Sequence, residues 1–420
     1  MKEKVLHYWK NLGPGLVSGA ADDDPSGIAT YSQTGAQYGF KFLWLSFFSL
    51  PFMVVVQEMC ARIGLVTGKG LTTNIKENYS KKVLYFCGLL LLFANTFNIG
   101  ADLGAMAQGV QLIFPSFDFT ILIIFFAVFS LCFQIFVPYK TYAKFLKYLT
   151  FALFSYIFSS LLIHINWHEA LKHTFIPSFS LTKDSIILIC AILGTTISPY
   201  LFFWQTSQEV EEHIAPNGLV SHDKNKKIKK HIGKMRIDVF SGMFFSNLVM
   251  FFIIIACAGT LFANGITDIT SAADAAQALR PFAGNLSYFL FAVGIIGTGL
   301  LAIPVLAGSA SYVIAETFDF KEGLFRKWYE AKVFYGVMIF AVGFGILFNF
   351  IGLDPIKALF YSALLNGLTA PVVLYLIVQL SSNEKVMGQF KSRKISKIIG
   401  WATFAIMTIV ALLAVFYLWM

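Results

Sequence analysis

Three consecutive aspartates, Asp22, Asp23 and Asp24, precede Pro25 in a segment that is otherwise apolar from residue 16 to residue 36. Acids inside a membrane-spanning segment are costly and usually functional, so these carboxylates are candidate ligands of a cation. Asp24 is the best placed, because an aspartate directly before a proline caps a new helix at that point. Successive helical residues point about 100° apart, so Asp22 and Asp23 reach the same ion only if the backbone unwinds. Otherwise they face an aqueous entrance and attract cations to it.

A second break follows in the stretch "GTTISPYLFFWQ", where Ser198 precedes Pro199 as Asp24 precedes Pro25, with Thr195 close by. Each of these two spans is therefore predicted to consist of two half-helices joined by an unwound stretch. Unwound backbone leaves carbonyls that hydrocarbon does not satisfy, so both breaks must line a cavity or bind a ligand. The breaks lie five spans apart, which predicts two inverted repeats with a shared site at the middle of the membrane. Two unrelated proline kinks are the alternative.

The composition places these breaks in a polytopic membrane protein. The chain has 420 residues, 57% hydrophobic and only 13% charged, whereas a soluble domain carries about 25% charged residues. A span needs about 20 apolar residues. Eleven segments reach that length: 13–36, 42–66, 84–113, 118–137, 146–165, 185–211, 237–263, 286–316, 332–352, 356–381 and 397–419. We therefore predict an all-α fold in one transmembrane domain, residues 1–420, with repeat one at about 13–165, repeat two at about 185–381 and an extra helix at about 397–419.

The basic residues give this chain an orientation. With the N-terminus inside, the outside retains only five of the 32 lysines and arginines: Lys41, Lys172, Lys183, Arg280 and Lys357. This positive-inside bias predicts a cell (inner) membrane protein with a cytoplasmic N-terminus and an extracytoplasmic C-terminus. It also accounts for the net charge of +9 without nucleic acid as a partner. The basic run at 224–236 is predicted to be a cytoplasmic loop facing anionic headgroups.

The residues around the breaks resemble a known family. The stretches "GPGLVSGAADDDPSGIATYSQTGAQYGFKFLW" and "SPYLFFWQ" resemble the first and sixth spans of the Nramp metal transporters, whose hallmarks there are Asp-Pro-Gly-Asn and Met-Pro-His. The resemblance covers nearly the whole chain and marks it as a divergent member. It implies the LeuT-type fold, with spans 1–5 and 6–10 as inverted repeats, broken spans 1 and 6, and alternating access to a midplane site.

The resemblance also assigns site residues and shows where this chain departs from the family. Asp24 matches the metal-binding aspartate, and Asn247 in span 7 matches a polar position. Asp102 in span 3 falls near a conserved acid and is a candidate for the proton pathway. The other positions carry replacements: Ser26 and Gly27 for the glycine and asparagine of span 1, Ser198 for the methionine, and Tyr200 and Gln205 for the two histidines of span 6.

These replacements change the expected substrate. A thioether is a soft ligand, and without it the site offers carboxylate, hydroxyl, amide and carbonyl oxygens, which suit hard ions such as Mg²⁺, Mn²⁺, Ca²⁺ or Fe³⁺. Gly27 removes ligand bulk, so we expect a widened site for a partly hydrated ion or for a metal–organic acid chelate such as ferric citrate. The metal is the substrate, and no cofactor is expected. The expected partners are this metal or chelate and the lipid bilayer, and the chain is expected to be monomeric.

Other functions remain as alternatives. An ion-coupled amino-acid or organic-acid transporter of the same fold would grip a carboxylate with the amides at Ser26 and Gly27, but Asp24 beside it would repel that group. A nutrient-sensing receptor would bind without transport, yet no signalling domain is present. An intramembrane enzyme needs a positioned nucleophile and base, and the sequence offers no convincing pair.

One further cluster lies at the predicted inner end of span 6. Glu211 closes that span beside the basic loop. Its carboxylate is either part of a hydrated helix end or half of an inner-gate salt bridge to Arg326 or Lys327.

Overall fold

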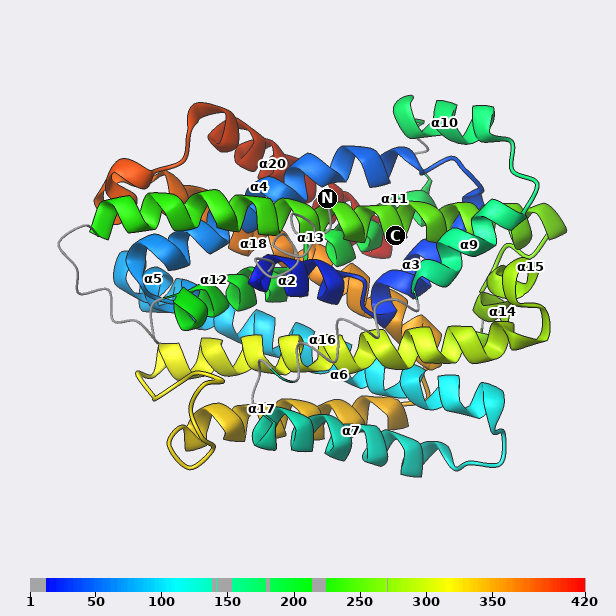
Figure 1. Ribbon diagram of the computed structural model, residues 1–420, viewed down its shortest axis with the longest axis horizontal. Helices are drawn as coiled ribbons and strands as arrows, with labels where there is room; N and C mark the ends of the chain where they lie inside the picture. The colour runs from blue at the N-terminus through cyan, green and yellow to red at the C-terminus, as the bar shows by residue number, and fades with distance from the viewer. Residues whose placement is uncertain are drawn as a thin grey trace, which may run out of the picture.

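The computed structural model describes residues 13–137, 141, 153–178, 182–213, 224–269 and 271–419. Most of the described residues are helical, and the long helices run along the longest axis of the molecule (Figure 1). The N-terminal basic residues and those at 140–147, which contribute to the predicted orientation, lie outside the described residues, apart from position 141.

The helices of the first half of the chain begin with a broken pair. They are α2 (Pro14–Asp22), α3 (Pro25–Tyr38), α4 (Trp44–Thr67), α5 (Leu71–Asn78), α6 (Lys81–Ile113), α7 (Phe119–Phe136), α9 (Phe154–Leu162) and α10 (Trp167–Phe175).

The second half begins with a broken pair in the same way. Its long helices are α11 (Lys183–Thr196), α12 (Pro199–His213), α13 (Lys224–Thr260), α16 (Ser287–Thr317), α17 (Lys332–Leu347), α18 (Pro355–Ser382) and α20 (Lys394–Trp419). Short elements join them: η2 (Phe262–Asn264), α14 (Ala272–Ala276), η3 (Gln277–Leu279), α15 (Arg280–Ala283), η4 (Gly284–Leu286), η5 (Phe348–Phe350), α19 (Glu384–Met387) and η6 (Gly388–Phe390).

The predicted span count is met only in part. Nine helical segments of the described chain are long and apolar enough to cross a membrane, with α11 and α12 together forming the one at 183–212. The first predicted span is not among them, because its break divides it into α2 and α3, each too short on its own. The fifth, 146–165, lies partly outside the described residues. Eleven spans therefore remain a prediction, while the helical, multi-pass architecture is confirmed.

The basic run at 224–236 is helical, and the prediction of a loop there was wrong. These residues form the first turns of α13, which extends over 37 residues. Lysine and arginine have good helix propensity, and the apolar residues Ile228, Ile232 and Met235 recur at helical spacing and are buried. The helix therefore continues beyond its apolar segment, and its basic residues extend past the bundle.

The two halves pack against each other reciprocally. Helix α13, the second long element of the second half, packs against α2 and α3, while α4, its counterpart in the first half, packs against α12. Helices α6 and α16 pack along each other, and α18 lies against both α11 and α6. This exchange places the two broken spans at the centre of the bundle, where Figure 1 shows α2 and α3.

Glycines allow the broken spans to approach their neighbours closely. A Cβ atom on Gly19 in α2 would overlap the backbone of Gly242 in α13, and one on Gly15 would lie 2.6 Å from the backbone nitrogen of Val239. In the second half, a Cβ on Gly194 in α11 would overlap the backbone of α18 around Gly367. Small residues of this kind let membrane helices pack backbone against backbone.

The long helices give the bundle two opposite ends. The α5 end is where α4 ends and α6 begins, and the α10 end is where α3 ends and α4 begins (Figure 1).

Candidate metal site

The break in the first span is short and is organised by Asp24. Helix α2 ends at Asp22, and α3 begins at Pro25 with Asp24 as its N-cap. The Oδ1 atom of Asp24 accepts hydrogen bonds from the backbone N–H of Gly27 at 2.8 Å and from the Ser26 hydroxyl at 2.6 Å. The predicted capping by Asp24 is confirmed, and its carboxylate is held at the start of the second half-helix.

The other oxygen of Asp24 is held by Asn98, a residue that was not predicted from the sequence. The Asn98 Nδ2 group in α6 donates to Asp24 Oδ2 at 3.0 Å, and Asn98 Oδ1 accepts from the Ser362 hydroxyl in α18 at 2.9 Å. Asn98 precedes Asp102 by four residues, so both lie on one face of α6. That spacing was the signal that could have identified Asn98 as a site residue.

The two preceding aspartates share one neighbour. The Ser246 hydroxyl in α13 lies 2.5 Å from Asp22 Oδ2 and 3.3 Å from Asp23 Oδ1. Both carboxylates are buried, and Asp22 Oδ1 has no hydrogen-bond partner in the described part of the chain. They therefore face α13, whereas Asp24 faces α6.

Asp102 lies on α6 one turn after Asn98. It is fully buried, and neither of its carboxylate oxygens has a hydrogen-bond partner among the described residues. The structure thus adds a fourth buried acid to the three at the break, on the same helix face as the residue that holds Asp24.

The second break lies against the first. Helix α12 begins at Pro199, and the Ser198 hydroxyl donates back to the carbonyls of Gly194 at 2.8 Å and Thr195 at 2.7 Å. The Ser198 side chain therefore satisfies carbonyls at the end of α11, whereas the sequence predicted that it would cap α12. The Tyr200 hydroxyl donates to the carbonyl of Ala21 at 2.9 Å and so joins the two breaks.

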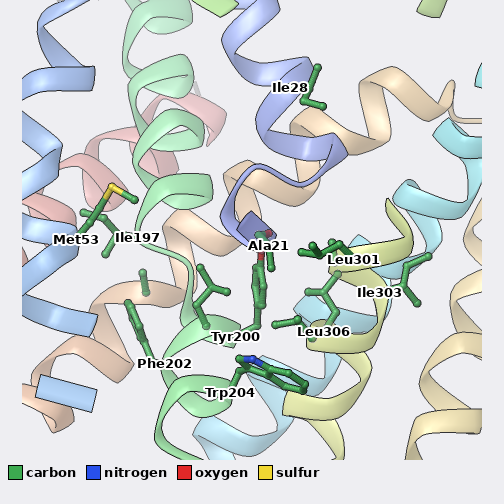
Figure 2. Close-up of a cluster of buried hydrophobic side chains, with 14 of the residues drawn as sticks. Ala21, Ile28, Met53, Ile197, Tyr200, Phe202, Trp204, Leu301, Ile303 and Leu306 are labelled. Carbon is green, nitrogen blue, oxygen red and sulfur yellow. Dashed lines mark hydrogen bonds between the residues drawn. The ribbon is translucent and has the colours of Figure 1, made fainter. Parts of the chain in front are cut away.

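Figure 2 shows this junction from the side, with Tyr200 reaching from α12 to Ala21 at the end of α2. Trp204, Leu301 and Leu306 lie near Tyr200 in the same view, and all of these side chains are buried. An apolar layer thus separates the acids from the α5 end of the bundle.

The space predicted at Gly27 is not open in this conformation. A Cβ atom on Gly27 would lie 3.2 Å from Thr195 Oγ1 and 3.3 Å from both the Asp22 carbonyl oxygen and a ring carbon of Tyr31. These neighbours close around the glycine because α3 packs directly against α11. Gly27 brings the two breaks together, and Thr195 faces it across the contact.

Two residues predicted to belong to the site are engaged elsewhere. Gln205 Nε2 donates to Glu209 at 2.9 Å, and its Oε1 accepts from Ser18 at 2.5 Å. Asn247 Oδ1 accepts from Ser49, and its Nδ2 donates to the Met243 carbonyl at 3.0 Å. Neither side chain contacts the aspartates, because each points from its helix toward a different neighbouring helix.

The α5 end is closed without the predicted salt bridge. Glu211 accepts hydrogen bonds from the Tyr312 hydroxyl and from the backbone N–H of Leu324, the latter at 2.9 Å. Among the described residues, Arg326 and Lys327 form no ion pair with it. The Arg326 guanidinium lies over the Phe325 ring, 4.9 Å from its centroid. Glu211 thus ties α12 to α16 and to the loop before α17 through neutral donors.

A cavity lies at the opposite end of the broken spans. Its volume is about 480 Å³, and residues of α3, α11, α18 and the segment after η2 line it. Among them are Gln33, Gln37 and the exposed acids Asp184 and Asp268. The structure is thus closed toward the α5 end and hollowed toward the α10 end.

The charge around the breaks favours a cation. Four buried aspartates lie at or beside the breaks, and no lysine, arginine or histidine in the described chain forms an ion pair with them. Carboxylates in a medium of low dielectric attract a cation strongly and repel an anion. Within the described residues, however, no three acidic, histidine or cysteine side chains converge on one point. An ion here would use one carboxylate together with hydroxyl, amide or carbonyl oxygens.

Two broken spans that meet beside buried acids, within a bundle of membrane-spanning helices, define a secondary transporter. The family model described as "Natural resistance-associated macrophage protein-like" (Nramp) matches residues 15–417, nearly the whole chain. The chain therefore belongs to the Nramp family of membrane metal transporters, and it is not an enzyme.

Individual relatives agree with this assignment. The chain is 23% identical over 404 residues to a "Divalent metal cation transporter MntH" of Caldanaerobacter subterraneus, which covers 94% of this chain and 90% of the relative. It is also 23% identical over 398 residues to the MntH protein of Bacillus subtilis, covering 93% and 88% of the two chains.

Solved structures show the same fold. A manganese transporter of Eremococcus coleocola superposes with a TM-score of 0.78 at 20% identity, covering 97% of this chain and 87% of that chain. The inward-facing conformation of Mhp1 superposes with a TM-score of 0.57 at 13% identity, covering 97% and 90%. The predicted LeuT-type fold is thereby confirmed.

Proposed function

We propose that this protein is a secondary-active importer of a hard divalent cation, with Asp24 as its principal ligand. The observation that carries the proposal is the fixed carboxylate of Asp24, held by Ser26, Gly27 and Asn98 among buried acids. The printed names of the relatives, divalent metal cation transporters and a manganese transporter, support the same class of substrate.

The identity of the cation follows from the donors beside Asp24. Ser198 stands where the family has its methionine, and Thr195 and the backbone carbonyls supply only oxygen. Oxygen ligands suit Mg²⁺ or Mn²⁺. The close contacts at Gly27 favour the ion over the bulkier ferric citrate, which would need a wider conformation. Fe³⁺ and its citrate chelate are therefore ranked second.

The direction of transport rests on the distribution of charge. The α5 end carries the basic stretches at 69–82, 321–332 and 385–397, which supports a cytoplasmic position for it. The hollowed α10 end would then face outward, and the conformation would be one that admits the ion from outside. This orientation places the N-terminus in the cytoplasm, the C-terminus outside, and the protein in the cell (inner) membrane.

Asp102 is proposed as a proton carrier for this transport. It is buried, without a hydrogen-bond partner among the described residues, on the helix face that holds Asp24. An imposed proton gradient should then drive metal uptake in the natural protein but not in Asp102→Asn. Uptake that is equally indifferent to the gradient in both would exclude this role.

A calorimetric titration of one preparation tests the substrate. Mg²⁺, Mn²⁺, Cd²⁺, citrate and ferric citrate are added in turn to the natural protein and to Asp24→Ala. We expect binding of Mg²⁺ or Mn²⁺ that disappears in the variant, with weak binding of Cd²⁺. Binding of ferric citrate alone would reject the free ion as substrate, and binding of none of these while an amino acid binds would reject metal transport.

A further inference from the structure

A second cavity lies at the α5 end, away from the metal site. It has a volume of about 610 Å³ and lies between the end of α7, the end of α12 and the loop that joins α16 to α17. Its walls include Phe136, Trp328 and Tyr329, whose side chains are 70%, 51% and 51% exposed. Exposed aromatic side chains of this kind gather where a membrane protein meets the headgroup layer. The cavity therefore lies at the level of the lipid headgroups.

Two basic side chains of this cavity have no acidic partner in the described part of the chain. Arg326 Nε donates to the Glu322 carbonyl at 2.9 Å, and the rest of its guanidinium makes no hydrogen bond there. Lys327 lies 5.7 Å from the centroid of the Tyr329 ring. Among the described residues, neither takes part in an ion pair. Both are therefore available to an anionic group that enters the cavity.

The acids near these bases do not neutralise them. Burial and the neighbouring carboxylates of Glu316 and Glu211 raise the pKa of Glu322 to about 9, despite the nearby Arg326, so Glu322 is uncharged at neutral pH. The carboxylate of Glu211 is already occupied by Tyr312 and the Leu324 amide. Glu212, which also lines the cavity, has an interaction of its own within the chain.

We propose that this cavity binds the headgroup of an anionic phospholipid, with its phosphate between Arg326 and Lys327. A phosphodiester accepts bonds from a guanidinium in the fork geometry that arginine provides. The apolar surface of α7 next to the cavity, where Phe136 is exposed, would take the acyl chains.

The position of the cavity gives this lipid a consequence for transport. Gln208 and Glu211 of α12 form part of its wall, and α12 is the inner half of the second broken span. A lipid that fills the cavity would hold α12 against α16 and the following loop. Anionic lipid is therefore expected to stabilise the conformation that is closed at the α5 end.

The test compares lipids on three forms of the intact protein: natural, Arg326→Gln/Lys327→Gln, and the control Lys385→Gln. Lys385 is an exposed lysine in another loop at the same end. Retention of phosphatidylglycerol and phosphatidylcholine is measured by native mass spectrometry, and thermal unfolding is measured with each lipid. We expect the natural protein and the control to retain phosphatidylglycerol preferentially and to gain thermal stability from it. The double variant should bind it roughly 30-fold more weakly, the loss expected for two basic groups at an anionic surface.

Further arms make the outcome decisive. Arg326→Lys/Lys327→Arg keeps both charges and should retain the lipid, which separates charge loss from misfolding. Equal retention by the natural protein and the double variant would overturn the proposal, and so would an equal loss in the control. If inorganic phosphate alone gave the same stabilisation, the cavity would be a simple anion site and the lipid assignment would be wrong.

Discussion

Replacing Asn98 by alanine should weaken metal binding without unfolding the protein. Asn98 makes the only contact to Asp24 from outside the break within the described residues, at 3.0 Å, and it is fixed in turn by Ser362. A hydrogen bond to a charged group contributes about 1.5–3 kcal/mol. Residues that orient a metal ligand typically change metal affinity by about 10- to 100-fold. We therefore expect Asn98→Ala to raise the dissociation constant for Mn²⁺ or Mg²⁺ by a factor in that range.

Asn95 provides the matched control for this experiment. It is a buried asparagine one turn earlier on α6, and it donates to the Leu306 carbonyl and the Ser309 hydroxyl instead of to Asp24. Asn95→Ala should therefore lower thermal stability while leaving metal affinity unchanged. Calorimetric titration of both variants separates the two effects. Equal affinities in Asn98→Ala and the natural protein, or equal losses in the two variants, would refute the view that Asn98 positions the Asp24 ligand.

Three further changes test softness, packing and charge. Ser198→Met should raise binding of Cd²⁺ relative to Mg²⁺, because a thioether favours soft ions, and unchanged relative affinities in a competition titration would contradict this. Gly19→Val should destabilise the protein by about 3 kcal/mol, because its side chain would overlap the backbone of Gly242, whereas Gly336→Val, with nothing within 4 Å of its Cβ, should not; thermal unfolding in detergent compares the two. The pKa of Glu322 is about 9 in the folded protein against an ordinary 4.5, so the folded state holds a proton that the unfolded state releases, and stability falls as pH rises between these values. Glu322→Gln should reduce that fall in unfolding temperature between about pH 6 and about pH 9, and an unchanged pH dependence would contradict the assignment.

The broken spans are the part of the fold that can be predicted best from the sequence. A proline behind a capping residue is a local signal, and the start of α3 at Pro25 and of α12 at Pro199 follows it. The beginning of α13 was missed because the prediction followed hydrophobicity alone. A basic stretch with good helix propensity continues a helix beyond the apolar segment.

The site was predicted less completely, because a sequence does not state which neighbour a side chain faces. Asp24 lies where the pattern placed it, but Gln205 and Asn247 bond to other helices. Asn98 carries no motif and is significant only because α6 passes the break. Such contacts depend on how distant helices pack, and only a three-dimensional structure supplies them.

Metal uptake into proteoliposomes tests the central claim most directly. The natural protein and Asp24→Ala are reconstituted at equal density, and entry of Mn²⁺ and Mg²⁺ is followed with an enclosed indicator. We predict saturable entry of at least one of these ions in the natural protein and none in the variant, with both unfolding at similar temperatures. Equal uptake by the two proteins would contradict the assignment of Asp24 as the ligand, and the absence of uptake in both would contradict transport of a hard divalent cation.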